Sequence, residues 1–204
     1  MLDGLQGEPA IEACVRGAPD AHRAVLLCHP HPLYGGTMHS AVVLALARVL
    51  AEADGVATLR FNYRGVGKSG GSYAEGVGET LDAKAAVASL DARFPDAKLA
   101  VCGYSFGTWV GLRAAAAATG RAIERVALVA PAVRIFKFVR EDAQPFHGRL
   151  AIYVGDQDEF CDVSEAQALA TSLGASLTVF PGNDHFFLAG RRKLAEAVVP
   201  FLDA

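Results

Sequence analysis

Residues 98–115 read KLAVCGYSFGTWVGLRAA and contain the pattern Gly103-x-Ser105-x-Gly107. The apolar run 98–102 is typical of a buried strand, and residues 108–115 have helical character. A G-x-S-x-G pentapeptide between a strand and a helix predicts a nucleophile elbow, a turn so sharp that the serine hydroxyl projects from the top of a sheet. Side chains at 103 and 107 would collide with the neighbouring strand and helix, which accounts for both glycines. Ser105 is therefore the first candidate catalytic residue.

The whole chain alternates between apolar, β-rich segments and helical segments. Besides the helix of the elbow, strands are predicted at 11–15, 24–28, 56–61, 99–102, 125–130, 150–154 and 176–180, and helices at 37–53, 79–94, 162–173 and 191–202. This alternation predicts an α/β fold with a mostly parallel sheet of about seven strands, covered by helices on both faces. We expect a single domain, residues 1–204, without a cap domain. The longest segment without clear periodicity, 131–148, has room only for a short helix and not for a lid.

Composition and charge exclude several classes of protein. The chain is 52% hydrophobic and 20% charged, which is typical of a globular protein. Its formal net charge is −3, and without a dense basic block we expect no nucleic-acid partner. We interpret the short run Arg191-Arg192-Lys193 as the start of a solvated helix face.

The amino terminus and the cysteines bear on location. Residues 1–9 lack the basic and apolar regions of a signal peptide, and no segment has the length of uninterrupted apolar sequence that a membrane span needs. The four cysteines are scattered without CxxC spacing, which argues against a disulfide framework or a zinc site. Buried free thiols in a reducing compartment fit better, so we expect a cytoplasmic protein with no membrane partner.

A serine hydroxyl is a weak nucleophile, and it needs a base that a third group orients. In a strand–helix fold those partners follow later strands, in the chain order Ser, acid, His. The loop 155–158 reads GDQD after one predicted strand, and the loop 182–185 reads GNDH after the next. His185 is therefore the candidate base, and Asp156, Asp158 and Asp184 are the nearby acids. Asp184 is adjacent to His185 and badly placed to orient its ring, so we expect it to bond backbone in its loop instead.

These three segments together resemble the α/β-hydrolase superfamily. The loop 29–38, HPHPLYGGTM, is similar to that of small lidless bacterial serine hydrolases, close to the dienelactone-hydrolase-like and carboxylesterase branch. Residues 64–71, RGVGKSGG, match the superfamily's Arg-Gly-x-Gly-x-Ser loop. The resemblance covers the chain from about residue 24 onward and implies an α/β-hydrolase fold.

Carried over residue by residue, the resemblance implies that Ser105 is the nucleophile and His185 the general base and then the general acid. The family motif Gly-x-x-Asp, read from Gly155, selects Asp158 as the orienting acid, with Asp156 as the alternative. The resemblance also implies an oxyanion hole with one donor in the backbone N–H of Phe106, where the elbow helix begins.

The second oxyanion donor comes from the loop after the strand 24–28. The family's His-Gly-x pattern reads His29-Pro30-His31 here, and proline has no N–H. The resemblance therefore assigns the donor to His31, with Leu33 and Tyr34 as alternatives.

Three other interpretations of single motifs are weaker. His29, His31 and His39 lack the helical spacings of metal-binding motifs, so no metal is expected. Gly67-Lys68-Ser69 is not a phosphate loop, because the Walker pattern requires a glycine at position 62, where this chain has asparagine. The cysteine nucleophile of true dienelactone hydrolases would occupy the position of Ser105, so Cys102 is expected in the core.

These residues favour a serine hydrolase without a cofactor, which cleaves a small carboxylic ester or thioester through an acyl-enzyme. An amidase or peptidase with the same residues, or a non-catalytic binding protein of the same fold, is the alternative. The short segment 131–148 predicts an open, shallow site for a small acyl substrate. Six aromatic residues are expected to line or border it, namely Tyr34, Tyr73, Phe106, Phe136, Phe160 and Phe187.

Overall fold

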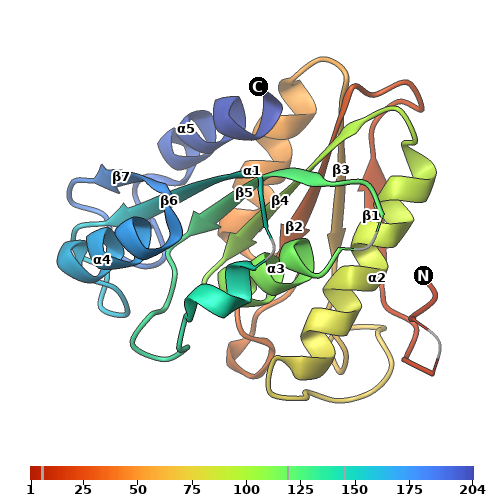
Figure 1. Cartoon of the computed structure of the whole chain (residues 1–204), viewed down its shortest axis with the longest axis horizontal. Helices are drawn as coiled ribbons and strands as arrows, with labels where there is room; N and C mark the ends of the chain where they lie inside the picture. The colour runs from red at the N-terminus through yellow and green to blue at the C-terminus, as the bar shows by residue number, and fades with distance from the viewer. Residues whose placement is uncertain (6, 119, 145) are drawn as a thin grey trace.

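The computed structural model describes residues 1–5, 7–118, 120–144 and 146–204, and within them seven strands form one sheet (Figure 1). In spatial order the strands are β1 (Ala13–Arg16), β3 (Val56–Phe61), β2 (Arg23–Cys28), β4 (Lys98–Tyr104), β5 (Ile123–Val129), β6 (Arg149–Gly155) and β7 (Ser176–Phe180). Every neighbouring pair is parallel except β1 and β3, which are antiparallel. The predicted fold class is confirmed.

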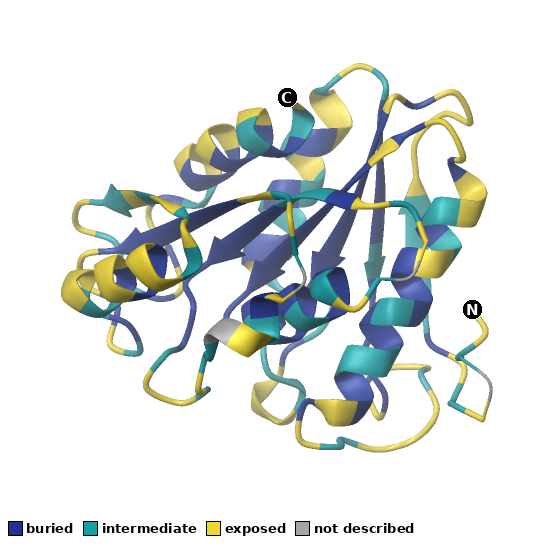
Figure 2. Ribbon diagram, viewed as in Figure 1, coloured by how far each residue is buried: buried dark blue, intermediate teal, exposed yellow. Residues whose placement is uncertain are grey.

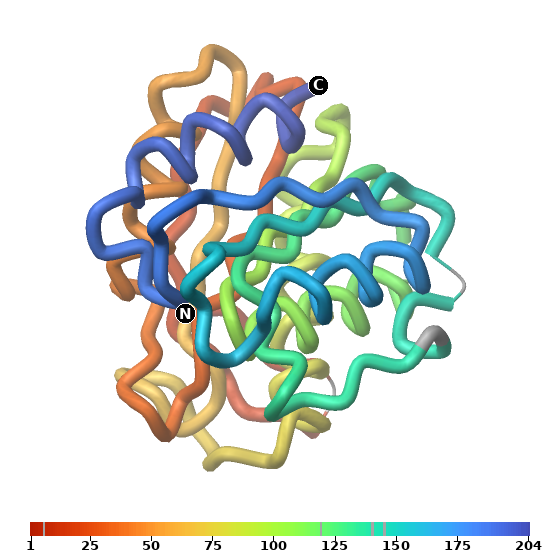
Figure 3. The backbone as a smooth tube through the Cα atoms, turned by 90° about the vertical axis from the view of Figure 1, so that its left-hand side faces the viewer, coloured from red at the N-terminus to blue at the C-terminus, as the bar shows by residue number. Residues whose placement is uncertain are grey.

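Helices cover both faces of this sheet (Figures 1 and 3). One face carries α1 (Ala41–Glu52) and α5 (Arg191–Asp203), and the other carries α2 (Val77–Arg93), α3 (Phe106–Ala116) and α4 (Val163–Leu173). All six residues of β2 are buried, and alternate residues enter opposite layers: Val25 and Leu27 pack toward α1 and α5, whereas Leu26 packs toward α2 and α3. Two-sided burial explains why the strands are almost continuously apolar (Figure 2).

Two helix boundaries differ from the sequence prediction, and polar side chains explain both. The helix predicted at 37–53 begins only at Ala41, because the Thr37 N–H donates to Ser40 Oγ at 3.1 Å and closes a turn before the helix. The helix predicted at 79–94 begins earlier, at Val77. Its Glu79 carboxylate accepts hydrogen bonds from the N–H groups of Ala74 and Gly76, at 2.9 and 2.7 Å, and so caps the first turn.

Between β5 and β6 the chain forms no helical lid in the part that the structure describes. It contains the short 3-10 helix η2 (Arg140–Ala143), which fits the expected short helix. Asp142 holds this segment against α3, because its carboxylate accepts from Trp109 Nε1 at 3.3 Å and pairs with Arg113 at 3.2 Å. The carboxyl ends of β4, β6 and β7 lie along one edge of the sheet, and in the described residues no helical lid covers that edge.

Candidate active site

The predicted strand–turn–helix around Ser105 is present. β4 ends at Tyr104, α3 begins at Phe106, and Ser105 between them has φ 55° and ψ −120°, a conformation that non-glycine residues rarely adopt. A Cβ at Gly103 would collide with the carbonyl oxygen of Gly107, and one at Gly107 with the carbonyl oxygen of Cys28. The reason predicted for the two glycines is confirmed.

Ser105, His185 and Asp158 form a continuous chain of hydrogen bonds. Ser105 Oγ lies 2.9 Å from His185 Nε2, and His185 Nδ1 lies 2.9 and 3.0 Å from the two carboxylate oxygens of Asp158. All three side chains are buried. A carboxylate only accepts, so Nδ1 carries the proton and Nε2 is left to accept the serine proton. This tautomer is the one that a general base requires.

The structure also separates the three nearby acids. Of Asp156, Asp158 and Asp184, only Asp158 is hydrogen-bonded to His185 among the described residues. Asp156 accepts a hydrogen bond from the Gly182 N–H at 2.7 Å and so connects the loop after β6 to the loop after β7. Asp184 accepts from the N–H groups of two following residues, at 3.1 and 3.2 Å, so the backbone bonding predicted for it is confirmed. The geometry favours Asp158 over Asp156 as the orienting acid.

His29 braces the loop after β2. Its Nδ1 donates to the carbonyl oxygen of Pro30 at 2.6 Å, and its Nε2 accepts from the Tyr63 N–H at 3.1 Å. The ring is fully buried, and burial lowers the pKa of His29 to about 4, which keeps it neutral. Within the described parts of the chain, no group of three or more His, Cys, Asp or Glu side chains could hold a metal ion.

The candidate oxyanion donors lie where α3 meets the β2 loop. Phe106 is the first residue of α3, so its N–H has no partner within the helix. The two alternative donors are already engaged: the Leu33 N–H donates to His31 Nδ1, and the Tyr34 N–H donates to the His31 carbonyl oxygen, each at 3.2 Å. Of the candidates for the second donor, this leaves the N–H of His31. The ring centroids of His31 and Phe106 are 4.9 Å apart, so the two candidate donors belong to residues in contact. The roles of Phe106 and His31 stay predictions.

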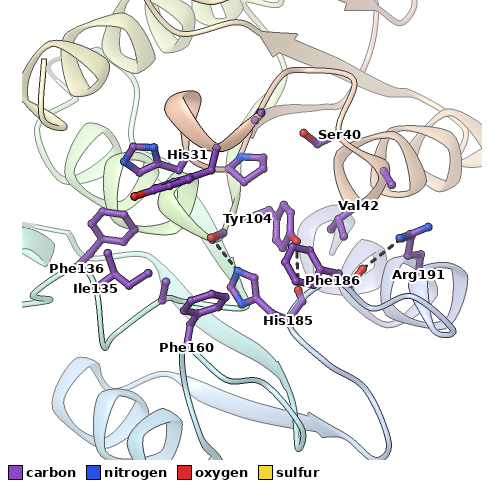
Figure 4. A pocket seen from close by; sticks show the side chains of 17 residues that line it. His31, Ser40, Val42, Tyr104, Ile135, Phe136, Phe160, His185, Phe186 and Arg191 are labelled. Atoms are coloured by element: carbon purple, nitrogen blue, oxygen red, sulfur yellow. Dashed lines mark hydrogen bonds between the residues drawn. The ribbon is translucent and has the colours of Figure 1, made fainter. Parts of the chain in front are cut away.

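An open cavity of about 570 Å³ leads to Ser105 and His185. Figure 4 shows His31, Ile135 and Phe136 at one end of this cavity, and Ser40, Val42 and Arg191 at the other, with His185 between them. None of the described residues that line it is Asp or Glu, and apart from its two histidines the only ionisable base is Arg191.

Three of the six aromatic predictions are confirmed, because Tyr34, Phe136 and Phe160 line the cavity. Tyr73 and Phe106 are not among the lining residues, and they pack against the ring of His31 with 4.9 Å between ring centroids in each case. The prediction for Phe187 is wrong, because its positive φ of 49° turns the side chain into the core, where it is fully buried. Its neighbour Phe186 is 48% exposed and lines the cavity in its place.

Two residues at the site were missed by the sequence prediction. Tyr104 donates its hydroxyl to the main-chain carbonyl of His185 at 3.2 Å, and thus connects the elbow to the histidine loop. Arg191 was expected on a solvated helix face, yet its side chain lines the cavity, with Nε donating to the Phe186 carbonyl at 3.3 Å. The sequence does place Arg191 in the first turn of the helix that follows the histidine loop, and this position could have indicated that it lies near the site.

Two family models match more than half of the chain each. The model described as "Serine aminopeptidase, S33" matches residues 19–137, and the model described as "Serine hydrolase" matches residues 85–196. An uncharacterised protein of Rickettsia prowazekii is 31% identical over 194 residues, which are 91% of this chain and 80% of that protein. In the described residues, no helix is long and apolar enough to cross a membrane.

Solved structures are similar to this chain over almost its whole length. A serine hydrolase homologue from Coxiella burnetii is 31% identical, with a TM-score of 0.81, over 95% of this chain and 96% of that one. A serine hydrolase without a lid from Xanthomonas campestris is 31% identical, with a TM-score of 0.80, over 97% of both chains.

Proposed function

Because the chain belongs to the α/β serine hydrolase superfamily, we propose that it hydrolyses small carboxylic esters or thioesters through an acyl-enzyme on Ser105. The observation that carries this proposal is the hydrogen-bond chain from Ser105 through His185 to Asp158, which lies at the bottom of an open cavity. A buried serine held at 2.9 Å from an oriented imidazole is the arrangement that nucleophilic catalysis needs.

The proposed reaction has two halves. Ser105 Oγ attacks the carbonyl carbon while His185 Nε2 takes the serine proton, and the negative oxygen is stabilised by the N–H groups of Phe106 and His31. The carbon–oxygen or carbon–sulfur bond then breaks, and His185 gives its proton to the leaving alcohol or thiol. In the second half, water attacks the acyl-serine while His185 Nε2 takes a proton from the water. The bond between the acyl carbon and Ser105 Oγ then breaks, His185 returns the proton to Oγ, and the carboxylic acid is released. Asp158 stabilises the charged imidazole in both halves.

The lining of the cavity bears on the alternative of an aminopeptidase or amidase with the same residues. An aminopeptidase has to bind a protonated α-amino group, which a carboxylate would stabilise. The described residues around this cavity include no Asp or Glu, and Arg191 would repel an ammonium group. The charge of the site therefore favours esters over amino-terminal peptides. A non-catalytic binding protein would not need the buried hydrogen-bond chain.

The proposal is tested by a fluorophosphonate probe together with a small panel of substrates. We expect one covalent adduct on Ser105 at neutral pH, and turnover of phenyl acetate, phenyl butyrate and a butyryl thioester. Aminoacyl anilides should be cleaved slowly or not at all. Ser105→Ala should remove both the adduct and the turnover, with Ser164→Ala, an exposed serine on α4, as the matched control.

The absence of an adduct on Ser105 in folded protein would contradict the proposal. Faster cleavage of aminoacyl anilides than of esters would favour the peptidase alternative. Strong activation by a lipid interface would contradict the expected preference for small acyl groups at an uncovered site.

A further inference from the structure

Arg191 carries the unmatched charge at the candidate active site. It is the first residue of α5, and the hydrogen bond from its Nε to the Phe186 carbonyl holds it beside the loop that contains His185. None of the salt bridges among the described residues involves its guanidinium. Its terminal N–H groups form no hydrogen bond with the described residues, and the side chain borders both the active-site cavity and a neighbouring hollow that includes Glu52.

The next arginine shows that this is not a general property of the helix. Arg192 is exposed, does not line the cavity, and pairs with Glu196 at 2.7 Å. Arg134, which lies near the opposite wall, is also satisfied, because it pairs with Asp162 at 2.7 Å and with Glu165 at 2.9 Å. Of these three arginines, Arg191 alone combines a place in the cavity wall with a free guanidinium.

The surroundings of Arg191 strengthen its attraction for an anion. The rest of the wall is mostly aliphatic or aromatic, so no other charged side chain among the lining residues competes with Arg191 for an anion. The first residues of α1, Ala41 and Val42, line the same end, so the positive end of that helix dipole adds to the charge of Arg191. A guanidinium presents paired N–H donors that match the two oxygens of a carboxylate.

We propose that Arg191 binds a carboxylate on the substrate, so that the protein prefers small anionic esters to neutral or cationic ones. This inference rests on the proposed esterase function. In such a substrate, an apolar portion would lie against Ile135 and Phe136, with the carboxylate at the opposite end beside Arg191. Both monoesters of dicarboxylic acids and esters of hydroxy acids have this chemistry.

The test measures selectivity within one protein sample. Phenyl butyrate is the neutral reference. Its partners are 4-carboxyphenyl butyrate, which carries the anion on the alcohol, phenyl hydrogen adipate, which carries it on the acyl group, and 4-(aminomethyl)phenyl butyrate, which is cationic. The readout is the kcat/KM of each partner divided by that of phenyl butyrate. Comparing this ratio between wild type and variant cancels both the intrinsic reactivity of the ester and the fraction of folded protein.

We expect Arg191→Gln to lower the ratio for one of the anionic esters by about tenfold, the size typical of a hydrogen-bonded charge pair. That ester identifies the part of the substrate that carries the carboxylate. Arg191→Lys should lower the ratio for that anionic ester less than Arg191→Gln does. In Arg191→Gln, the ratio for the cationic ester should rise. Arg192→Gln, the matched control, should keep the wild-type ratios. Salt should lower the anionic ratio in wild type and much less in Arg191→Gln.

Three contradicting outcomes are distinguishable. If phenyl butyrate is turned over and the fluorophosphonate labels Ser105, but neither anionic ratio changes in Arg191→Gln, the anion proposal is overturned and the esterase proposal stands. If no ester is turned over and no label appears on Ser105, the proposed function fails first. An equal loss for all esters would assign Arg191 a purely structural role and would also overturn the inference.

Discussion

The floor and the rim of the candidate active site are built in opposite ways. On the floor, Ser105, Asp158 and His185 are at most 8% exposed, follow the strands β4, β6 and β7, and are hydrogen-bonded to one another. On the rim, Tyr34 and Ile135 are 85% and 55% exposed. The fold therefore determines the geometry of the reacting groups, whereas short surface segments determine which substrates reach those groups. Changes to the floor should therefore alter the rate for every substrate, and changes to the rim should alter the choice among substrates.

After the loss of turnover expected in Ser105→Ala, the largest effect on the floor is expected from Asp158. Asp158→Asn keeps the shape of the side chain but can donate to His185 Nδ1, which favours the wrong tautomer, so kcat should fall by about 10³–10⁴-fold for all esters. The measurement is kcat and KM for phenyl acetate and phenyl butyrate. Asp156→Asn is the matched control and should lose no more than a few-fold. A comparable loss in Asp156→Asn would reassign the orienting acid.

The next largest effect concerns the free energy of unfolding, which should depend on pH through His29 in the loop after β2. The pKa of His29 is about 4 in the folded chain against 6.5 for an ordinary histidine, so between these values the unfolded chain binds more protons. The free energy of unfolding should therefore fall as pH falls through this window, by about 2 kcal/mol between pH 7 and pH 5.

Urea denaturation of wild type and His29→Gln at both pH values measures this term. Wild type should lose about 2 kcal/mol more than the variant, because only wild type contains the titrating ring. The ring signals of His29 in a histidine-resolved NMR titration give an independent readout, and they should remain those of a neutral ring at pH 5. A protonated ring at pH 5 in folded protein would contradict the prediction.

A smaller effect on the floor is expected from Tyr104. Tyr104→Phe removes the hydrogen bond to the His185 carbonyl, and one such bond corresponds to a loss of about fivefold in kcat. The loss should be similar for short and long acyl esters, since Tyr104 acts here through the position of His185. Tyr153→Phe, in the same core layer on β6, is the control and should change kcat less. A rise in KM at unchanged kcat would instead assign Tyr104 to substrate contact.

The smallest effect is expected on the rim. Ile135→Ala removes part of an exposed apolar wall, so kcat/KM for phenyl hexanoate relative to phenyl acetate should fall by about threefold. Val77→Ala is the control, because Val77 is 64% exposed and does not line the cavity. An equal fall for both esters would show that Ile135 supports the floor, and it would weaken the division between the two regions.

Local sequence signals were enough to predict the floor. The elbow around Ser105 follows from sterics within ten residues, and the chain order of acid and histidine follows from the parallel sheet. The choice of Asp158 over Asp156 required the family motif, because both acids occupy one loop and only three-dimensional contacts separate them. The start of α1 was predicted too early, because apolar periodicity does not show that Ser40 closes a turn.

Contacts at the rim depend on tertiary structure, and there the sequence prediction was right for Tyr34, Phe136 and Phe160 but wrong for Phe187 and Arg191. Phe186 and Phe187 are adjacent and chemically identical, and the positive φ of Phe187 decides which of them faces the cavity. Arg191 and Arg192 are likewise adjacent and chemically identical, and the sequence does not show which of them lines the cavity. A charged run normally indicates a solvated surface, but the histidine loop folds back beside α5 and brings Arg191 into the cavity wall.

The missing lid also has a kinetic consequence. Asp142 pins η2 to α3, and in the described part of the chain the cavity above Ser105 is open. In the proposed reaction, water would reach the acyl-serine through the same opening as the ester, so water, the most concentrated nucleophile present, should consume the intermediate. An uncovered cavity of this kind is suited to irreversible hydrolysis. A transferase would have to exclude water long enough for a second acceptor to bind.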